Sequence, residues 1–296
     1  MRRALAAALI ALGACGPRVQ PPPSRLPPPP PPPSTLGWLP AELVTAVRAP
    51  GAGAPMIAFV ARSPRRPPCV DAALAGVRET LQLQRARDAR MALVLVGALD
   101  RDRLEACGVE TARALFGLAV TARRDGALTI FEGGGGAQIA GFGGERAVLA
   151  DTAAQVRAIL HPARAIGPAD PLGPLLPRLS AGALAAITVI DYLAPWTKVP
   201  ARATTLRLEL RPALRAEARV RYADPAAARR ARDALAQIRA GARDDAPFAL
   251  RQALAPLELA VEGAELACEL EPLLTAKYEK ILPRVLEILA PAGPPP

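Results

Sequence analysis

The side chain with the most constrained chemistry lies near the start of the chain, where Cys15 follows a short apolar segment. The chain begins Met1-Arg2-Arg3, continues as an uncharged apolar run over 4–12 and reaches Cys15 through Gly13-Ala14. A basic start, a short apolar run and small residues before a cleavage point are typical of a secretory signal. The run is far too short to cross a bilayer as a mature helix.

The segment Leu12-Gly13-Ala14-Cys15 resembles the lipobox of bacterial lipoproteins. That resemblance implies diacylglycerol on the Cys15 thiol, cleavage before Cys15 and acylation of the new amine in Gram-negative cells. Two or three acyl chains, at ~0.8 kcal/mol for each buried CH₂, hold a protein at a membrane without a transmembrane helix. Gly16 stands where an Asp would imply inner-membrane retention, so we expect the outer membrane, facing the periplasm or the cell surface. The alternative is an ordinary signal peptide in which Cys15 is incidental.

The other three cysteines would enter an oxidising compartment with the exported body. Cys69 opens one expected helix and Cys107 closes another, with a strand between them, so we predict a disulfide between these two residues. Alternation over 264–270 places Cys268 on an apolar face as a core thiol. Because no second Cys or His stands at zinc-ligand spacing and His161 is the only histidine, we expect no metal and no cofactor.

The remaining patterns that suggest catalysis have a plainer interpretation. His161 precedes Pro162 at a helix end, where an imidazole can cap carbonyl groups. The glycine-rich stretches at 133–136 and 141–144 fit neither a dinucleotide fingerprint nor a P-loop, so we interpret them as turns. Asp244-Asp245 is expected to cap a helix rather than to form an acid–base pair. The sequence therefore nominates no catalytic residue.

A loop bounded by prolines carries the candidate binding residues, which are Tyr192, Trp196, Lys198 and Arg202. Aromatic and cationic side chains together can grip a glycan or a partner protein. The alternative is that Trp196 only closes the edge of the core. An amphipathic helix from Pro272 onward is expected to dock on its own sheet, with membrane or partner contact as the alternative.

Prolines divide the chain into parts. Seven consecutive prolines at 27–33 favour polyproline II, so the segment before the body serves as a stalk. The expected parts are a signal peptide (1–14), a lipidated Cys with a Pro-rich linker (15–35), an N-terminal α+β unit (36–160), a Pro-rich connector (161–182), a C-terminal α+β unit (183–290) and a disordered tail (291–296). One continuous domain is the alternative for a body of this length.

Hydrophobic periodicity predicts the elements of the N-terminal half, where 91–96 is an unbroken apolar run typical of a central strand. The expected elements are a hairpin of 42–48 and 56–61, a helix over 70–87, the strand at 91–96, a helix capped by Asp100 and ending at Cys107, a hairpin turning at Asp125-Gly126, strands over 137–142 and 146–150, and a helix capped by Asp151 and ending at Leu160.

The C-terminal half alternates strictly between apolar and charged residues. The expected elements are a hairpin of 206–210 and 214–222, a helix from Asp224-Pro225 to Gly241, a short helix at 246–255, a hairpin over 257–270 turning at Gly263, and the terminal helix. The fold class is α+β, with two antiparallel-sheet units each covered by helices. The similar order of elements in the halves leaves a diverged duplication open, on pattern alone.

The formal net charge is +10, but export removes nucleic acid as a partner. One C-terminal hairpin presents Arg207, Arg211, Arg215, Arg219 and Arg221, and the other presents Glu258, Glu262, Glu265 and Glu269. We predict that these hairpins are neighbours in one sheet and that their charges pair laterally. Separate patches would instead make the arginine row a site for anionic polymers.

These observations favour a membrane-anchored envelope lipoprotein whose body is a non-catalytic protein- or ligand-binding module. Its expected partners are the membrane, envelope proteins or cell-wall polymers. The body resembles uncharacterised lipoproteins of high-GC Gram-negative bacteria in its strand-Asp-helix units, and that resemblance implies no function. The alternatives are a periplasmic enzyme with an unrecognised carboxylate site, and a carrier of an apolar ligand with an enclosed cavity.

Overall fold

The computed structural model describes residues 36–273 except 54–56, 58–59, 62, 89–90, 134–135, 180–181, 192, 210–213 and 243–258. Several expected features lie outside these residues: the lipobox with Cys15, the Pro-rich stalk, the short helix at 246–255 and nearly all of the terminal helix. Pro272 is the exception, because it belongs to the last strand instead of opening a helix.

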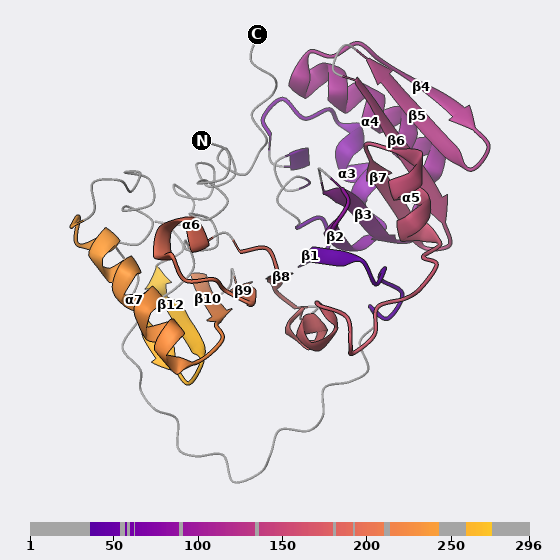
Figure 1. The fold of residues 1–296 in the computed structure, drawn as a ribbon. Helices are drawn as coiled ribbons and strands as arrows, with labels where there is room; N and C mark the ends of the chain where they lie inside the picture. The colour runs from indigo at the N-terminus through magenta and orange to yellow at the C-terminus, as the bar shows by residue number, and fades with distance from the viewer. Residues whose placement is uncertain are drawn as a thin grey trace. The chain divides into compact units, whose positions relative to one another are not determined.

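The described part is an α+β fold (Figure 1). Its elements are β1 (Leu43–Pro50), α3 (Cys69–Leu74), β2 (Val77–Arg85), β3 (Ala92–Gly97), α4 (Arg101–Phe116), β4 (Val120–Asp125), β5 (Leu128–Gly133), β6 (Gly136–Gly143), β7 (Arg146–Ala150), α5 (Ala153–Leu160), the 3-10 helix η1 (Gly173–Arg178), β8 (Leu184–Thr188), α6 (Ala194–Thr197), β9 (Ala203–Glu209), β10 (Leu214–Arg221), α7 (Pro225–Arg239), β11 (Ala260–Glu262) and β12 (Glu265–Leu273).

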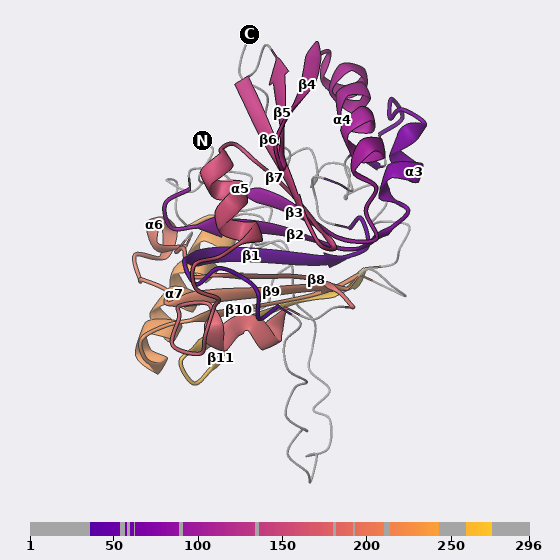
Figure 2. The same cartoon turned by 90° about the vertical axis from the view of Figure 1, so that its right-hand side faces the viewer.

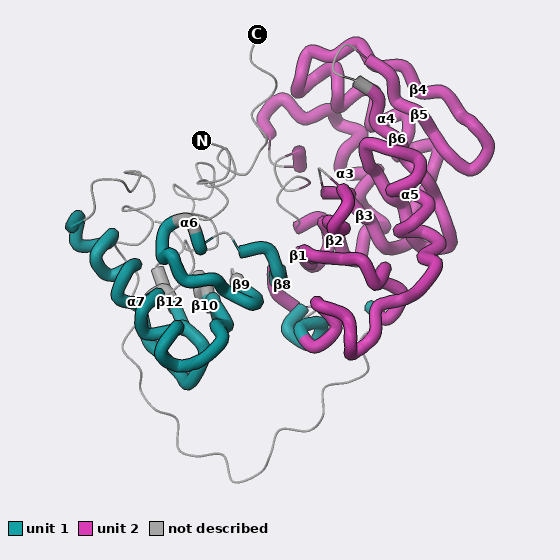
Figure 3. The backbone as a smooth tube through the Cα atoms, viewed as in Figure 1, with its two compact units in different colours: residues 1–36, 175–179, 185–296 teal, residues 37–174, 180–184 magenta. Residues whose placement is uncertain are grey.

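The strands form one twelve-stranded sheet in the order β11-β12-β10-β9-β8-β1-β2-β3-β7-β6-β5-β4. Every strand pair with a defined register is antiparallel. The expectation of two sheets is therefore wrong, because β8, which the sequence pattern did not reveal, is part of the same order. Contacts divide the chain into unit 1 (Met1–Leu36, Leu175–Leu179, Ala185–Pro296) and unit 2 (Gly37–Pro174, Ser180–Leu184), shown in Figure 3.

Unit 2 has helices on both faces of its strands (Figure 2). A Cβ added at Gly108 of α4 would lie 3.5 Å from the ring of Phe131, so α4 packs on the face that carries Phe131. A Cβ at Gly141 of β6 would instead meet Val156 of α5 at 2.4 Å. β3 is buried between the two layers, as its unbroken apolar sequence predicted.

The long helix expected at 70–87 is wrong, because only α3 is helical and β2 follows it. Gly76 separates the two elements, since a Cβ there would lie 1.9 Å from the carbonyl oxygen of Ala98. Leu81 and Leu83 are then buried by a period of two. The hairpin expected at 42–48 and 56–61 is also wrong, because β1 pairs with β2 and the described residues 57, 60 and 61 are helical.

Two helix caps in unit 2 show how local side chains set the helix ends. Asp100 Oδ1 accepts a hydrogen bond from the backbone N–H of Arg103 at 3.0 Å, as expected, but α4 continues past Cys107 to Phe116. α5 is capped by Thr152 instead of Asp151, whose carboxylate accepts a hydrogen bond from Gln138 at 2.5 Å. The turn at Asp125-Gly126 and the strands β6 and β7 are confirmed.

In unit 1, the two hairpins and the helix between them are confirmed. Asp224 Oδ1 accepts a hydrogen bond from the N–H of Ala227 at 2.7 Å and caps α7. The buried face of α7 packs with β10 and β12 into a core. Because β2 takes the place of most of the long helix in the N-terminal half, the described residues do not repeat the order of elements that suggested a duplication. Within the described ranges, each helix is too short or too polar to span a membrane.

Candidate binding site on the C-terminal sheet

The predicted binding loop is divided between core and solvent. Trp196 is half-buried and packs against the core of unit 1. Lys198 is exposed in a left-handed conformation, with φ 58°, at the end of α6. Arg202 is exposed, and its backbone N–H donates to the carbonyl oxygen of Arg221 at 2.7 Å. Tyr192 lies outside the described residues.

Asp191 closes this loop at both ends. Its Oδ1 accepts hydrogen bonds from the N–H groups of Leu193 at 3.0 Å and Ala194 at 2.9 Å. Its Oδ2 accepts the N–H of Ala201 at 2.6 Å. One side chain thus satisfies three backbone donors and fixes the path of the loop between residues 191 and 201.

A buried hydroxyl lies in the core of unit 1. Tyr222 is 1% exposed, and its hydroxyl has no hydrogen-bond partner among the described residues. Burial raises the pKa of Tyr222, and the nearby charges of Asp191 and Cys268 raise it further. The phenol therefore stays neutral at physiological pH. Its ring packs in the core, and its hydroxyl is a hydrogen-bond donor that no described residue satisfies.

The predicted lateral pairing of arginine and glutamate rows is confirmed where the side chains are described. β10 and β12 are neighbours, with Arg221 opposite Glu265 in the register. Arg221 donates to Glu265 Oε1 through Nε at 3.1 Å and through Nη2 at 2.8 Å. Arg219 donates to Glu262 at 2.9 Å and to Glu217 at 2.5 Å. Much of the positive field of β10 is thereby cancelled.

The other members of these rows are only partly described. On β9, Arg207 lies opposite Glu217 in the register. Arg215 lies opposite Glu209, and Glu269 lies opposite Glu217, although nothing is known of the side chains of Arg215 and Glu269. Arg211 and Glu258 lie outside the described residues.

A small recess opens on this charged face, and all of its lining belongs to unit 1. It encloses about 20 Å³, which is room for about one water molecule. Its lining includes Leu175 and Arg178 of η1, Thr205 of β9, Arg219 and Arg221 of β10, and Glu265 of β12. The recess therefore gathers three arginines against one glutamate.

Sequence reasoning missed the contribution of η1 to this recess. Arg178 lies in the Pro-rich connector, whose prolines interrupt every periodic pattern. Thr205 lies in β9 but just before the predicted strand, which began at residue 206, and its side chain carries no charge. No sequence pattern predicts that Arg178 and Thr205 lie near Arg219, because η1 meets the strands only in the folded chain.

Glu105 and Asp170 have lowered pKa values, whereas a carboxylate that acts as a general acid needs a raised pKa. Burial opposes the charge of Glu105, but hydrogen bonds from Arg101, Thr129 and Arg124 outweigh it and lower its pKa. A hydrogen bond from Arg164 lowers the pKa of Asp170. In the described ranges, no group of three His, Cys, Asp or Glu residues is placed to hold a metal ion.

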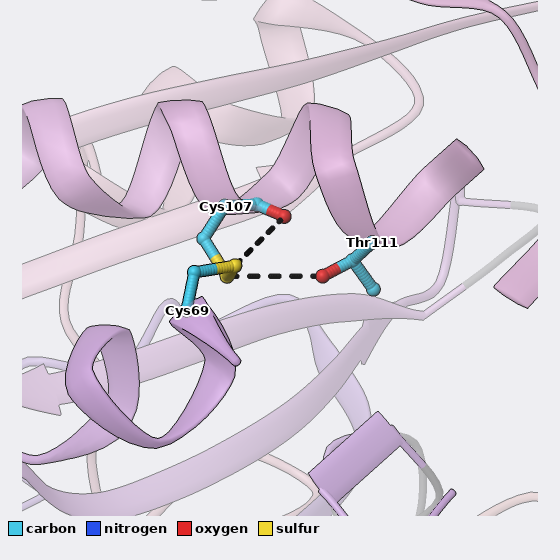
Figure 4. Close-up of a disulfide and its surroundings, with 3 residues drawn as sticks. All are labelled: Cys69, Cys107 and Thr111. Carbon is cyan, nitrogen blue, oxygen red and sulfur yellow. Dashed lines mark hydrogen bonds between the residues drawn. A yellow bond between two sulfur atoms is a disulfide. The ribbon is translucent and has the colours of Figure 1, made fainter. Parts of the chain in front are cut away.

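The Cys69–Cys107 disulfide joins α3 to α4 in unit 2, as predicted (Figure 4). Its Cα atoms are 5.6 Å apart. Cys107 Sγ lies 3.8 Å from the hydroxyl of Thr111, one turn further along α4. Cys268 is buried and takes part in no disulfide, in agreement with its expected place in the core.

Comparison with solved structures finds a similarity of fold between this chain and TP0453. No protein-family model matches the chain, and no curated protein matches it. Crystal form III of TP0453, from Treponema pallidum, aligns with a TM-score of 0.51 and 12% identity over 85% of this chain and 97% of that chain. Crystal form I gives the same TM-score and identity over 86% and 96%. The chain is thus similar to TP0453 in fold, at an identity that carries no information on chemistry.

Proposed function

We propose that this chain is an envelope lipoprotein, anchored through lipid on Cys15, whose folded body is a non-catalytic binding module. The single observation that carries the envelope location is the Cys69–Cys107 disulfide. Disulfides persist in oxidising compartments such as the periplasm and are rare in the cytosol. This evidence from the folded body is independent of the signal and lipobox pattern, and both lead to the same compartment.

The similarity of fold to TP0453 supports an envelope role. TP0453 is a membrane-associated protein. Its chain is almost entirely covered by the alignment, so the likeness extends over the whole body and is not limited to one hairpin. No described helix of our chain can cross a membrane, so an anchor on Cys15 would supply the attachment.

The lowered pKa values of two carboxylates favour a binding role over catalysis. A hidden acid–base site would need acidic side chains with raised pKa values in a cleft. Glu105 and Asp170 are instead held ionised by arginine partners. The recess beside η1 encloses too little volume for an acyl chain, so it does not serve an apolar-ligand carrier.

The anchor is tested by comparing the full-length chain with its Cys15→Ser variant in a Gram-negative host. We expect the wild type in the membrane fraction, labelled by a palmitate analogue and with an acylated N-terminal mass. Cys15→Ser should take up no label, while a matched Cys268→Ser variant should be labelled like the wild type. Recovery of wild-type protein in soluble form with an unmodified N-terminus would refute the anchor.

The compartment is tested separately by thiol alkylation of the native protein before and after reduction. Cys69 and Cys107 should become reactive only after reduction. Cys268 should react only after unfolding, because it is buried. Alkylation of Cys69 and Cys107 without reduction would argue against an oxidising compartment, whatever the fate of the lipid label.

A further inference from the structure

Arg178 differs from the other arginines of the recess in its partners. Arg219 donates to Glu217 and to Glu262, and lies 3.8 Å from Glu265 as well. Arg221 donates to Glu265. The side chain of Arg178, in contrast, has no hydrogen bond or ion pair with any described residue, although it lines the same recess. A guanidinium is always charged and presents five N–H donors, so Arg178 keeps its full capacity to bind an anion.

The backbone position of Arg178 is fixed by the fold. It is the last residue of η1, in which Leu175 and Leu176 are buried. The next residue, Leu179, is also buried, and its N–H donates to the carbonyl oxygen of Leu176 at 3.0 Å. Arg178 therefore extends from a backbone anchored on both sides, and it reaches the recess from an element outside the strands.

Arg221 also retains binding capacity. Its Nε and Nη2 share a single carboxylate oxygen of Glu265, which leaves Nη1 without a described partner. Its side chain is 52% exposed, so this nitrogen is accessible to a ligand. Thr205 of β9, which lies opposite Arg219 in the register, also lines the recess and carries a hydroxyl.

We propose that the recess binds the phosphate group of a phosphorylated ligand, held between Arg178 of η1 and Arg221 of β10. A carboxylate has two oxygens, which one arginine fork saturates, whereas a tetrahedral phosphate offers enough oxygens for two forks and a hydroxyl. The recess has room for about 20 Å³, so one phosphate oxygen enters it, and the other phosphate oxygens meet the guanidinium groups at its open mouth.

This inference rests on the proposed role of the body as a binding module and names its ligand chemistry. The phosphate can be the monoester of a free phosphorylated solute, which presents three unesterified oxygens, or the diester of a phospholipid headgroup, which presents two. The two sources differ in presentation, because a headgroup arrives in a charged surface. Lipid anchoring and phosphate binding are measured on different variants, so failure of one leaves the other intact.

The test is a calorimetric titration of the purified full chain with inorganic phosphate, with sodium chloride at equal ionic strength as the blank. Saturable binding is expected for the wild type. Arg178→Gln should weaken it about tenfold, since it removes charge-assisted hydrogen bonds. The matched control is Arg230→Gln, which removes an exposed arginine of α7 in the same unit and should leave the affinity unchanged. Thr205→Val should weaken binding without changing any charge.

Two outcomes would overturn the site. The first is that the folded wild type shows no saturable phosphate binding. The second is that Arg178→Gln and Arg230→Gln lose affinity for phosphate equally, because an equal loss indicates diffuse electrostatic attraction and not a site. Glycerol 3-phosphate and phosphatidylglycerol vesicles then separate the sources. A headgroup ligand predicts binding to phosphatidylglycerol vesicles that Arg178→Gln reduces and Arg230→Gln does not. A free solute predicts glycerol 3-phosphate binding with no vesicle binding.

Discussion

Replacing Glu105 with Gln should destabilise the fold by about 3 kcal/mol at neutral pH. Glu105 is 7% exposed. One oxygen accepts Nε of Arg101 at 2.6 Å and the hydroxyl of Thr129, and the other accepts Nε of Arg124 at 2.8 Å. Glutamine keeps one acceptor oxygen but turns an NH₂ donor toward a guanidinium, so one arginine loses its bond to residue 105 and two donors face each other. Arg124 keeps its contact with Asp102, and Arg101 keeps those with Leu128 and Thr129.

The magnitude follows from the burial of the three groups. A hydrogen bond to a charged group contributes ~1.5–3 kcal/mol, and breaking a buried ion pair costs ~3–5 kcal/mol. The side chains of Arg101 and Arg124 are 28% and 52% exposed, so water compensates part of the loss. We therefore expect a value near the lower end, at ~3 kcal/mol, measured by urea unfolding.

The pH dependence gives this prediction a second readout. The folded pKa of Glu105 is lowered, so its contribution is present above the unfolded pKa of about 4.5 and is lost as pH falls through the folded value. The gap between wild type and Glu105→Gln should thus close in acid. The control is Glu110→Gln, on the exposed side of α4, which should stay within ~0.5 kcal/mol of wild type. Equal stabilities of the two variants, or a gap that persists unchanged in strong acid, would refute the reasoning.

Three further changes test other parts of the fold. Replacing Cys69 and Cys107 together with Ala opens a link of sequence separation 38 and should lower the free energy of unfolding by ~4 kcal/mol, with no further effect of dithiothreitol on the variant. Tyr222→Phe removes an unsatisfied buried hydroxyl and should leave the melting temperature unchanged or higher; a clear drop would reveal a hidden partner. Gly76→Ala forces a Cβ against the Ala98 carbonyl and should lower stability by more than ~2 kcal/mol, while Gly182→Ala, with open space around it, should be mild.

Sequence patterns predicted the elements whose side chains alternate between core and water. β10 and β12 alternate cleanly, so their pairing and the lateral contacts of Arg219 and Arg221 followed from the sequence. The disulfide followed from the placement of two cysteines on separate elements of a body that we expected to be exported. In these cases a local pattern determined the structure.

The errors arose where two periods fit the same residues. Val77 and Leu81 are spaced by four, as on a helix, yet they belong to β2, where the buried Leu81 and Leu83 follow the period of two. Gly76 was the signal against a long helix, and its meaning depends on Ala98, far along the chain. The recess needed Arg178 beside β10, a tertiary relation that no local pattern contains.

The last strand in the sheet order, β4, affects how copies of this protein behave when they are crowded together. Among the described strands it pairs with β5 alone, and its residues are exposed from Thr121 to Asp125. An open edge of this length is a template for aggregation. Arg123, Arg124 and Asp125 place three consecutive charges along it, and a second strand could add there only by stripping their water. If the proposed lipid anchor holds the protein in the plane of a bilayer, copies meet more often than free ones do, and a charged edge then disfavours strand pairing between them.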